Sequence, residues 1–184
     1  MHRSLGGWPS ILDEADRRHH LLRAVALARE SADAGALVYA LEALAIEDIN
    51  TDAAAEAAVV ADEGFALARS AGMDSAAVIL ACRRAEAALN LGDSATAIRM
   101  ADWALANAAA GNLLTQFIAG YVLALAHART GDVRQARAAA DLFREITRRH
   151  HDAYIGLYGP EALAEELKAV DDALAAMGTA SALQ

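Results

Sequence analysis

The chain has 184 residues, of which 56% are hydrophobic and 22% are charged, so it can bury a core and is not disordered by composition. Alanine is abundant and aromatic residues make up 5%, a balance that favours helices and excludes a β-sandwich, a barrel or an alternating βαβ fold. The net charge of −9 argues against a general nucleic-acid-binding protein, and the single cysteine, Cys82, excludes a disulfide framework and a multi-cysteine zinc site.

The sequence shows neither a secretory signal nor a membrane span. Residues 1–9 lack the apolar core of a signal peptide, and no stretch reaches the roughly 18 uncharged apolar residues that a membrane helix needs. We therefore expect a cytoplasmic protein that does not associate with a membrane. Its expected organisation is an N-terminal extension over 1–10, a single helical domain over 11–178 and a flexible tail over 179–184.

Helical periodicity accounts for most of the chain. The first helix is predicted over 11–31. The last is predicted over 160–177, after a link over 149–159, because Pro160 suits the first position of a helix and Gly178 suits the position after its end. Between them, three helix pairs are predicted at 34–49 with 53–70, 74–91 with 94–109, and 112–130 with 133–149.

Two short motifs recur along these pairs at nearly constant spacing. Gly-Asp occurs at Gly92-Asp93 and Gly131-Asp132, 39 residues apart, with glycine suited to the positive φ after one helix and aspartate to the N-cap of the next. Asn50-Thr51-Asp52 takes the same place in the first pair, with Asn50 as the expected residue of positive φ. A fixed period built from helix pairs indicates a helical solenoid. Between the pairs, an Ala-Gly turn is predicted at Ala34-Gly35, Ala71-Gly72 and Ala110-Gly111, 37 and then 39 residues apart.

Small side chains recur at matching positions of the three pairs. Such positions let the paired helices approach closely, as ridge-into-groove packing requires. They are Ala45, Ala85 and Ala124 in the first helices, and Ala57, Ala97 and Ala136, then Ala61, Ala101 and Ala140 in the second helices. The next position of the series holds Gly64 and Ala104 in the first two pairs and the larger Phe143 in the third.

The third pair resembles the tetratricopeptide (TPR) family. It reads YVLALAHARTGDVRQA over 121–136, followed by Ala140 and Phe143, which is the family's pattern of small residues, a glycine turn and Ala-x3-Ala-x2-aromatic. The second pair matches it, whereas the first has Asp52 in place of the turn glycine. The period, nearer 39 than the usual 34 or so, resembles the divergent, MalT-like TPR arrays of large bacterial transcriptional activators. The resemblance implies an all-α, right-handed α-solenoid of antiparallel helix pairs, with about three repeats plus flanking helices.

A TPR array usually holds its ligand on a concave surface lined by the first helix of each pair. Among the residues placed there, Tyr39 and Tyr121 are the candidate anchors, because rigid aromatic side chains bind peptides at small entropic cost. The alternative is that each tyrosine packs on a neighbouring layer. The dense Lys/Arg/Asn set of a carboxylate clamp is missing. The candidate ligand-binding residues implied by the resemblance are Tyr39, Glu42, Cys82, Glu86, Asn90, Tyr121 and Arg129.

Charge is distributed unevenly along the chain. From Glu30 to Glu63 there are nine acidic residues and neither lysine nor arginine, whereas from Arg129 to Arg149 there are six arginines. These runs are either two solvated faces or functional surfaces. In the second case they are the poles of a solenoid that stacks head to tail, or the acidic run is a surface for a basic partner.

Patterns typical of enzymes and metal sites are missing from the sequence. The histidine clusters, His19-His20 and His150-His151-Asp152, form neither a His-Glu-x-x-His nor a paired Glu-x-x-His motif, so we expect no metal and no cofactor. Cys82 lies within an apolar helical row, where a thiol behaves as a small hydrophobic residue. A helical enzyme or ligand pocket that uses His127 or Cys82 stays as a third hypothesis.

The expected function is a non-catalytic protein–protein interaction module that binds a peptide or protein segment on its concave or acidic face. Homo-oligomerisation is compatible with this function, and direct contact with nucleic acid is not expected. The alternative is the sensor or oligomerisation part of a bacterial transcriptional regulator of the LuxR/MalT-like or antibiotic-regulator type. No helix-turn-helix DNA reader is recognised in the sequence, so such a part would act through another chain or domain.

Overall fold

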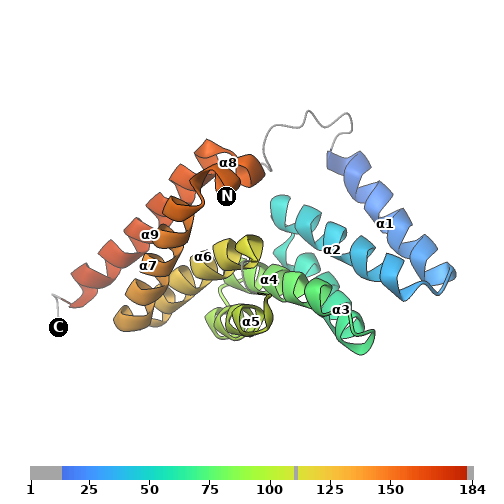
Figure 1. Cartoon of the computed structure of the whole chain (residues 1–184), viewed down its shortest axis with the longest axis horizontal. Helices are drawn as coiled ribbons and strands as arrows, with labels where there is room; N and C mark the ends of the chain where they lie inside the picture. The colour runs from blue at the N-terminus through green and yellow to red at the C-terminus, as the bar shows by residue number, and fades with distance from the viewer. Residues whose placement is uncertain (1–13, 110–111, 182–184) are drawn as a thin grey trace.

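The computed structural model describes residues 14–109 and 112–181, and within these ranges it contains nine helices and no strand (Figure 1). The predicted all-α class is therefore confirmed. None of the described helices combines the length and apolar character needed to cross a membrane. The helices are α1 (Glu14–Glu30), α2 (Ala34–Asn50), α3 (Ala54–Ser70), α4 (Asp74–Asn90), α5 (Ser94–Asn107), α6 (Leu113–Thr130), α7 (Val133–Arg149), α8 (His151–Tyr158) and α9 (Pro160–Ser181).

The three predicted pairs are α2–α3, α4–α5 and α6–α7, each within two residues of its predicted bounds. The predicted link over 149–159 is wrong, because it contains the short helix α8, which buries both of its tyrosines, Tyr154 and Tyr158. Pro160 is the first residue of α9 as predicted, but Gly178 does not end that helix. A glycine costs a helix only about 1 kcal/mol relative to alanine, and α9 continues through it to Ser181.

The turns between helices share one geometry. Gly72, Gly92 and Gly131 have φ of 69°, 80° and 81°, as predicted for the residue after a helix. Each next helix begins two residues later. The carboxylates of Asp93 and Asp132 accept hydrogen bonds from backbone N–H groups in the first turn, both at 3.0 Å.

Two turn predictions are wrong. Ala34 and Gly35 begin α2, and the turn before them has Ala32 at φ 53°. In the first pair the residue of positive φ is Asp52, at 59°, because Asn50 is still the last residue of α2. The Ala110-Gly111 turn lies outside the described residues.

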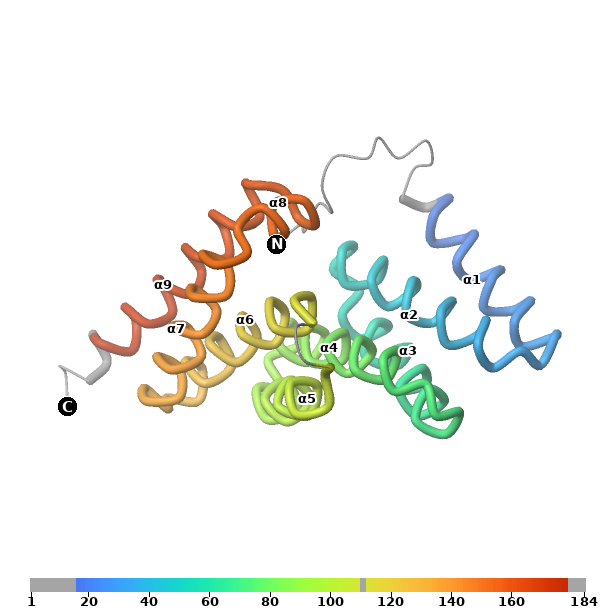
Figure 2. The backbone as a smooth tube through the Cα atoms, viewed as in Figure 1, coloured from blue at the N-terminus to red at the C-terminus, as the bar shows by residue number. Residues whose placement is uncertain are grey.

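The helices form two rows that run side by side along an arch (Figure 1). The first helices pack in succession, α2 on α4 and α4 on α6, and α9 continues this inner row by packing on α6. The second helices α3, α5 and α7 each pack on the first helices beside them and form the outer row. Figure 2 shows α5 end-on, crossing below α4 and α6 in the middle of the molecule. This order of contacts is that of a helical solenoid.

The core lies along the positions where small side chains recur. All twelve positions predicted from the repeat are buried. Gly64 shows why size matters there, since a Cβ atom on it would lie 2.9 Å from Leu80 Cδ2 and 3.3 Å from Leu41 Cβ. Helices α2, α3 and α4 therefore approach one another so closely at Gly64 that a side chain would displace its neighbours.

Candidate functional site

A pocket of about 450 Å³ lies across the C-terminal ends of α4 and α6. It brings together three of the seven predicted site residues, namely Asn90, Tyr121 and Arg129. Half of its lining is polar or charged in character and half is aliphatic, which is typical of sites that orient a ligand as well as bury it. The lining residues are Asp52, Leu89, Asn90, Tyr121, Leu125, Arg129, Ala169 and Ala173.

Arg129 is held at this pocket by the end of α4. It lies in the last turn of α6, and its Nη1 donates a hydrogen bond to the Leu89 carbonyl, one of the last carbonyls of α4. A cation at this position is favoured because the C-terminus of a helix carries partial negative charge. The contact fixes the guanidinium group next to Asn90, the last residue of α4.

Tyr121 serves the core and the pocket together. It is 8% exposed, and its ring centroid lies 5.8 Å from that of Phe143 on α7. Tyr121 thus packs on the second helix of its own pair and also lines the pocket. Tyr39, by contrast, is 62% exposed on α2 and is not among the pocket-lining residues.

Five lining residues were not predicted as site residues, namely Asp52, Leu89, Leu125, Ala169 and Ala173. Ala169 and Ala173 lie one turn apart on α9, which brings them against α6, and their small side chains help to leave the space open. Asp52 comes from the turn between α2 and α3. A signal for Asp52 was present in the sequence, since it puts a carboxylate where the other two pairs have a turn glycine.

Glu42, Cys82 and Glu86 lie away from the pocket, around a buried arginine that the sequence analysis did not single out. Arg83 on α4 is 7% exposed, and its Nη1 lies 2.7 Å from Glu86 Oε2. Burial raises the pKa of Glu42 on α2, and the Arg83 charge offsets part of that shift. Arg83, Glu86 and Glu42 form a charged cluster inside the inner row, which we call the Arg83 cluster.

Cys82 is a core residue. It is 1% exposed, and burial raises the pKa of its thiol to about 12, so the thiol stays protonated at neutral pH. A protonated, buried thiol is neither a nucleophile nor a contact for a ligand, and the prediction that Cys82 lines the binding surface is wrong. The expectation that it behaves as a small hydrophobic residue agrees with this position.

About half of the members of the two charged runs form ion pairs within the chain. Acidic residues of α2 and α3 pair with arginines of α1 and α4, and arginines of α7 pair with acidic residues of α7 and α9. The acidic run therefore offers an outside partner less free charge than its composition indicates. The pairs are Arg17–Glu47, Arg18–Asp48, Arg29–Glu63, Arg84–Asp62, Arg144–Asp171, Arg148–Glu145 and Arg149–Glu145.

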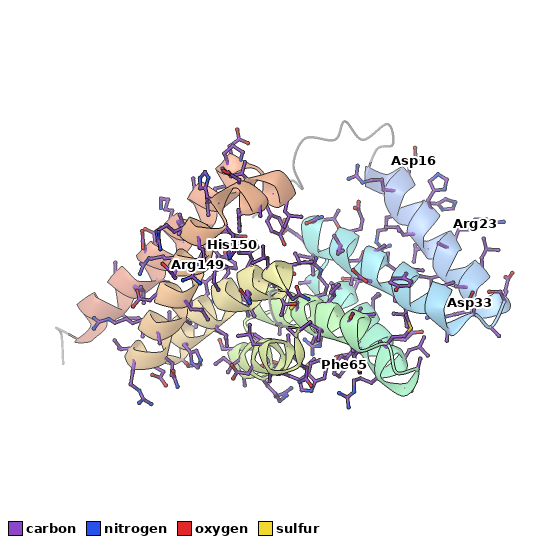
Figure 3. The ribbon with its side chains drawn as sticks, in the orientation of Figure 1. Asp16, Arg23, Asp33, Phe65, Arg149 and His150 are labelled. Atoms are coloured by element: carbon purple, nitrogen blue, oxygen red, sulfur yellow. The ribbon has the colours of Figure 1, made fainter. Side chains whose placement is uncertain are left out.

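The histidine clusters do not come together. Asp16 and Arg23, which flank His19 and His20 on α1, lie at the opposite end of the arch from His150 (Figure 3). Among the described residues, no group of three or more His, Cys, Asp and Glu is arranged to hold a metal ion.

Comparison of the chain with protein-family models, with curated proteins and with solved structures found no significant match.

Proposed function

We propose that the chain is a non-catalytic interaction module of the TPR type, with a right-handed solenoid, and that it binds a peptide or protein segment at the pocket of Asn90, Tyr121 and Arg129. The observation that carries the proposal is the convergence of these three residues, which come from two successive helices of the inner row. Residues that the repeat places at equivalent surfaces thus meet at one hollow large enough for several peptide atoms.

The chemistry of the lining suits a polypeptide segment. Arg129 offers charged donors, Asn90 offers a donor and an acceptor, and Tyr121 offers an aromatic ring. Leu89 and Leu125 supply apolar surface beside them. A peptide carries backbone carbonyls, backbone N–H groups and side chains that match these three kinds of contact.

The test starts from a library of random peptides of about a dozen residues displayed on phage and selected on the immobilised protein. The affinity of each selected peptide is then measured in solution for the wild type, for Arg129→Gln, and for Arg134→Gln as a matched change on α7 outside the pocket. We expect Arg129→Gln to weaken binding by about tenfold, or about 1.4 kcal/mol, and Arg134→Gln to have no effect.

Thermal unfolding of both variants checks that Arg129→Gln has not acted by releasing the end of α4. Peptides that bind the wild type and Arg129→Gln equally well would contradict the proposed site. The same conclusion would follow if Tyr121→Phe and Asn90→Ala, which leave Arg129 in place, had no effect either.

A further inference from the structure

We propose that two copies of the chain form a dimer by exchanging α1, so that α1 of each copy packs on α2 and α3 of the other. Helix α1 lies at one end of the arch and is joined to α2 by residues 31–33, so the exchange leaves the other described helices of each copy in place (Figure 1). The proposal goes beyond the proposed function, because the pocket of Asn90, Tyr121 and Arg129 does not involve α1.

The turn between α1 and α2 holds an alanine in a conformation that suits glycine. Ala32 has a φ of 53°, whereas the turns before α4, α5 and α7 place Gly72, Gly92 and Gly131 at positive φ. In the part of the chain that the structure describes, Asp52 is the other residue besides glycine with positive φ, and aspartate tolerates it better than alanine. The Cβ atom of Ala32 therefore strains the closed turn. Short turns under strain favour the exchange of elements between copies.

The same turn is able to open. Its three residues, Ser31, Ala32 and Asp33, are all exposed. None of them is glycine or proline, and alanine is the best helix former, so α1 and α2 can join into one continuous helix in which Ala32 has negative φ. The Asp33 carboxylate, which accepts a hydrogen bond from the Ala36 N–H at 2.9 Å, is then replaced by a backbone carbonyl of the preceding turn.

The contacts between α1 and α2 are arranged symmetrically about this turn. Arg17 Nε lies 3.2 Å from Glu47 Oε1. Arg18 Nε lies 2.7 Å from Asp48 Oδ1. The midpoints of these two pairs are residues 32 and 33, which belong to the turn. A twofold axis through the opened turn therefore places α1 of one copy antiparallel to α2 of the other in the same register, and both pairs form again between the copies.

The surface that α1 covers fits a second copy of α1. Asp48 is fully buried, so its carboxylate needs an arginine in the position of Arg18. At the other end of the helix, Arg29 lies 2.7 Å from Glu63 of α3. Between them, Val25 is 4% exposed and packs with leucines of α2. Helix α1 carries this set of charged and apolar contacts in one register, so a second copy supplies all of them.

The dimer keeps the ion pairs of the monomer and forms them between copies instead of within one copy. Salt therefore favours neither form, whereas a higher protein concentration favours the dimer. This behaviour distinguishes the exchange from head-to-tail stacking through the charged runs, in which added salt lowers the mass.

The first experiment changes residue 32 of the full chain. The protein is refolded from urea at high concentration, and the dissociation constant of the dimer is measured by dilution, with size-exclusion chromatography and light scattering. We expect Ala32→Gly to raise this constant about tenfold or more, because glycine removes the strain from the closed turns of two monomers. Ala32→Val should lower it, since a β-branched residue fits positive φ less well than alanine. Ala26→Gly, a matched change on the exposed side of α1, should leave it unchanged.

The second experiment identifies the exchanged element by its charge. In Arg17→Glu/Arg29→Glu and in Glu47→Arg/Glu63→Arg, α1 meets like charges on its own copy and on a second copy of the same variant. A dimer with one copy of each variant has opposite charges in all of these pairs. When the two variants are refolded together, native mass spectrometry should find about ten mixed dimers or more for each dimer of like copies. Association that does not exchange α1 gives equal numbers of the two kinds.

Three results would each overturn the proposal. They are the absence of a dimer in both the wild type and Ala32→Val, an unchanged dissociation constant in Ala32→Gly, and equal numbers of mixed and like dimers. If a charge variant does not fold, the changes at residue 32 decide the question, because they alter no charge. None of these results bears on the pocket, so the proposed function stands or fails by its own peptide-binding test.

Discussion

Arg83 lies on α4 between a carboxylate of its own helix, Glu86, and one of α2, Glu42. It also interacts electrostatically with Tyr158 of α8, so one side chain connects three helices that are distant in sequence. Buried ion pairs contribute little net stability compared with apolar residues of the same size, but removing one member leaves a charge in the interior. Removing one charge of the Arg83 cluster should therefore lower the stability of the fold more than removing the two charges of the Arg83–Glu86 pair together.

We expect Arg83→Met to lower the free energy of unfolding by about 3–5 kcal/mol, because it leaves the Glu86 carboxylate buried without the Arg83 charge. The double variant Arg83→Met/Glu86→Leu should lose much less, since it removes both charges and keeps the volume. Urea unfolding followed by circular dichroism measures both. If the double variant were as unstable as the single one, the loss of stability would not come from leaving Glu86 without the Arg83 charge.

At the level of the helices, the small residues of the repeat determine how closely neighbouring helices pack. The inner and outer rows meet through small residues, and at Gly64 of α3 the approach to Leu80 of α4 and Leu41 of α2 leaves no room for a Cβ atom. Alanine stands at the equivalent place of α5 and phenylalanine at that of α7, so the three pairs are not spaced identically.

Gly64→Leu should destabilise the chain by about 1–3 kcal/mol or more, because its side chain would force α3 away from α2 and α4. Ala66→Leu is the matched control on the exposed side of the same helix and should change stability by less than about 0.5 kcal/mol. The difference between their urea midpoints is the measurement. Equal midpoints would mean that the close approach at Gly64 is not required.

The repeat register could be predicted from the sequence. Together with the resemblance to TPR arrays, it led to the prediction of three residues that line the pocket. Glycine at positive φ and aspartate at an N-cap are local signals, and they placed the turns at Gly92 and Gly131 correctly. Asn90, Tyr121 and Arg129 followed from the same register.

What the sequence could not reveal depends on tertiary contacts. Helix α8 has no side-chain cap at His150, and it buries Tyr154 against Phe117 of α6, with ring centroids 4.9 Å apart. Because α8 interrupts the repeat, the positions of Ala169 and Ala173 relative to α6 could not be extrapolated from it. Arg83 was missed for a related reason, since charged residues are mostly exposed and its burial involves Tyr158 of that same helix.

At the scale of the whole molecule, several members of the two charged runs pair with other residues of the same chain. Arg18 pairs with the fully buried Asp48 at 2.7 Å, and Arg144 pairs with Asp171 at 2.5 Å. In a solenoid that stacked head to tail through its two charged runs, these groups would have to pair with residues of the neighbouring copy instead.

We therefore expect size-exclusion chromatography with light scattering to give the same mass at low and at high salt. Screening weakens contacts between exposed charges, so a mass that falls as salt is added would indicate stacking between unlike charges. In that case Arg134→Glu and Arg137→Glu, both exposed on α7, should lower the mass at low salt as well.

The way in which α3 and α5 contact each other in the outer row affects how the arch can bend. Whereas α2, α4 and α6 pack directly on one another, α3 and α5 meet through Phe65, which is labelled in Figure 3, and Trp103. The two ring centroids are 4.9 Å apart, and Arg69 Cζ lies 5.2 Å from the centroid of the Trp103 ring. Long side chains change rotamer more easily than packed helices separate, so we expect the arch to bend more readily at its outer edge than along its inner row. Since Asp52 and Arg129 follow helices separated by α4, a change in curvature alters the gap between them. The width of the pocket is thereby coupled to aromatic contacts on the opposite side of the molecule.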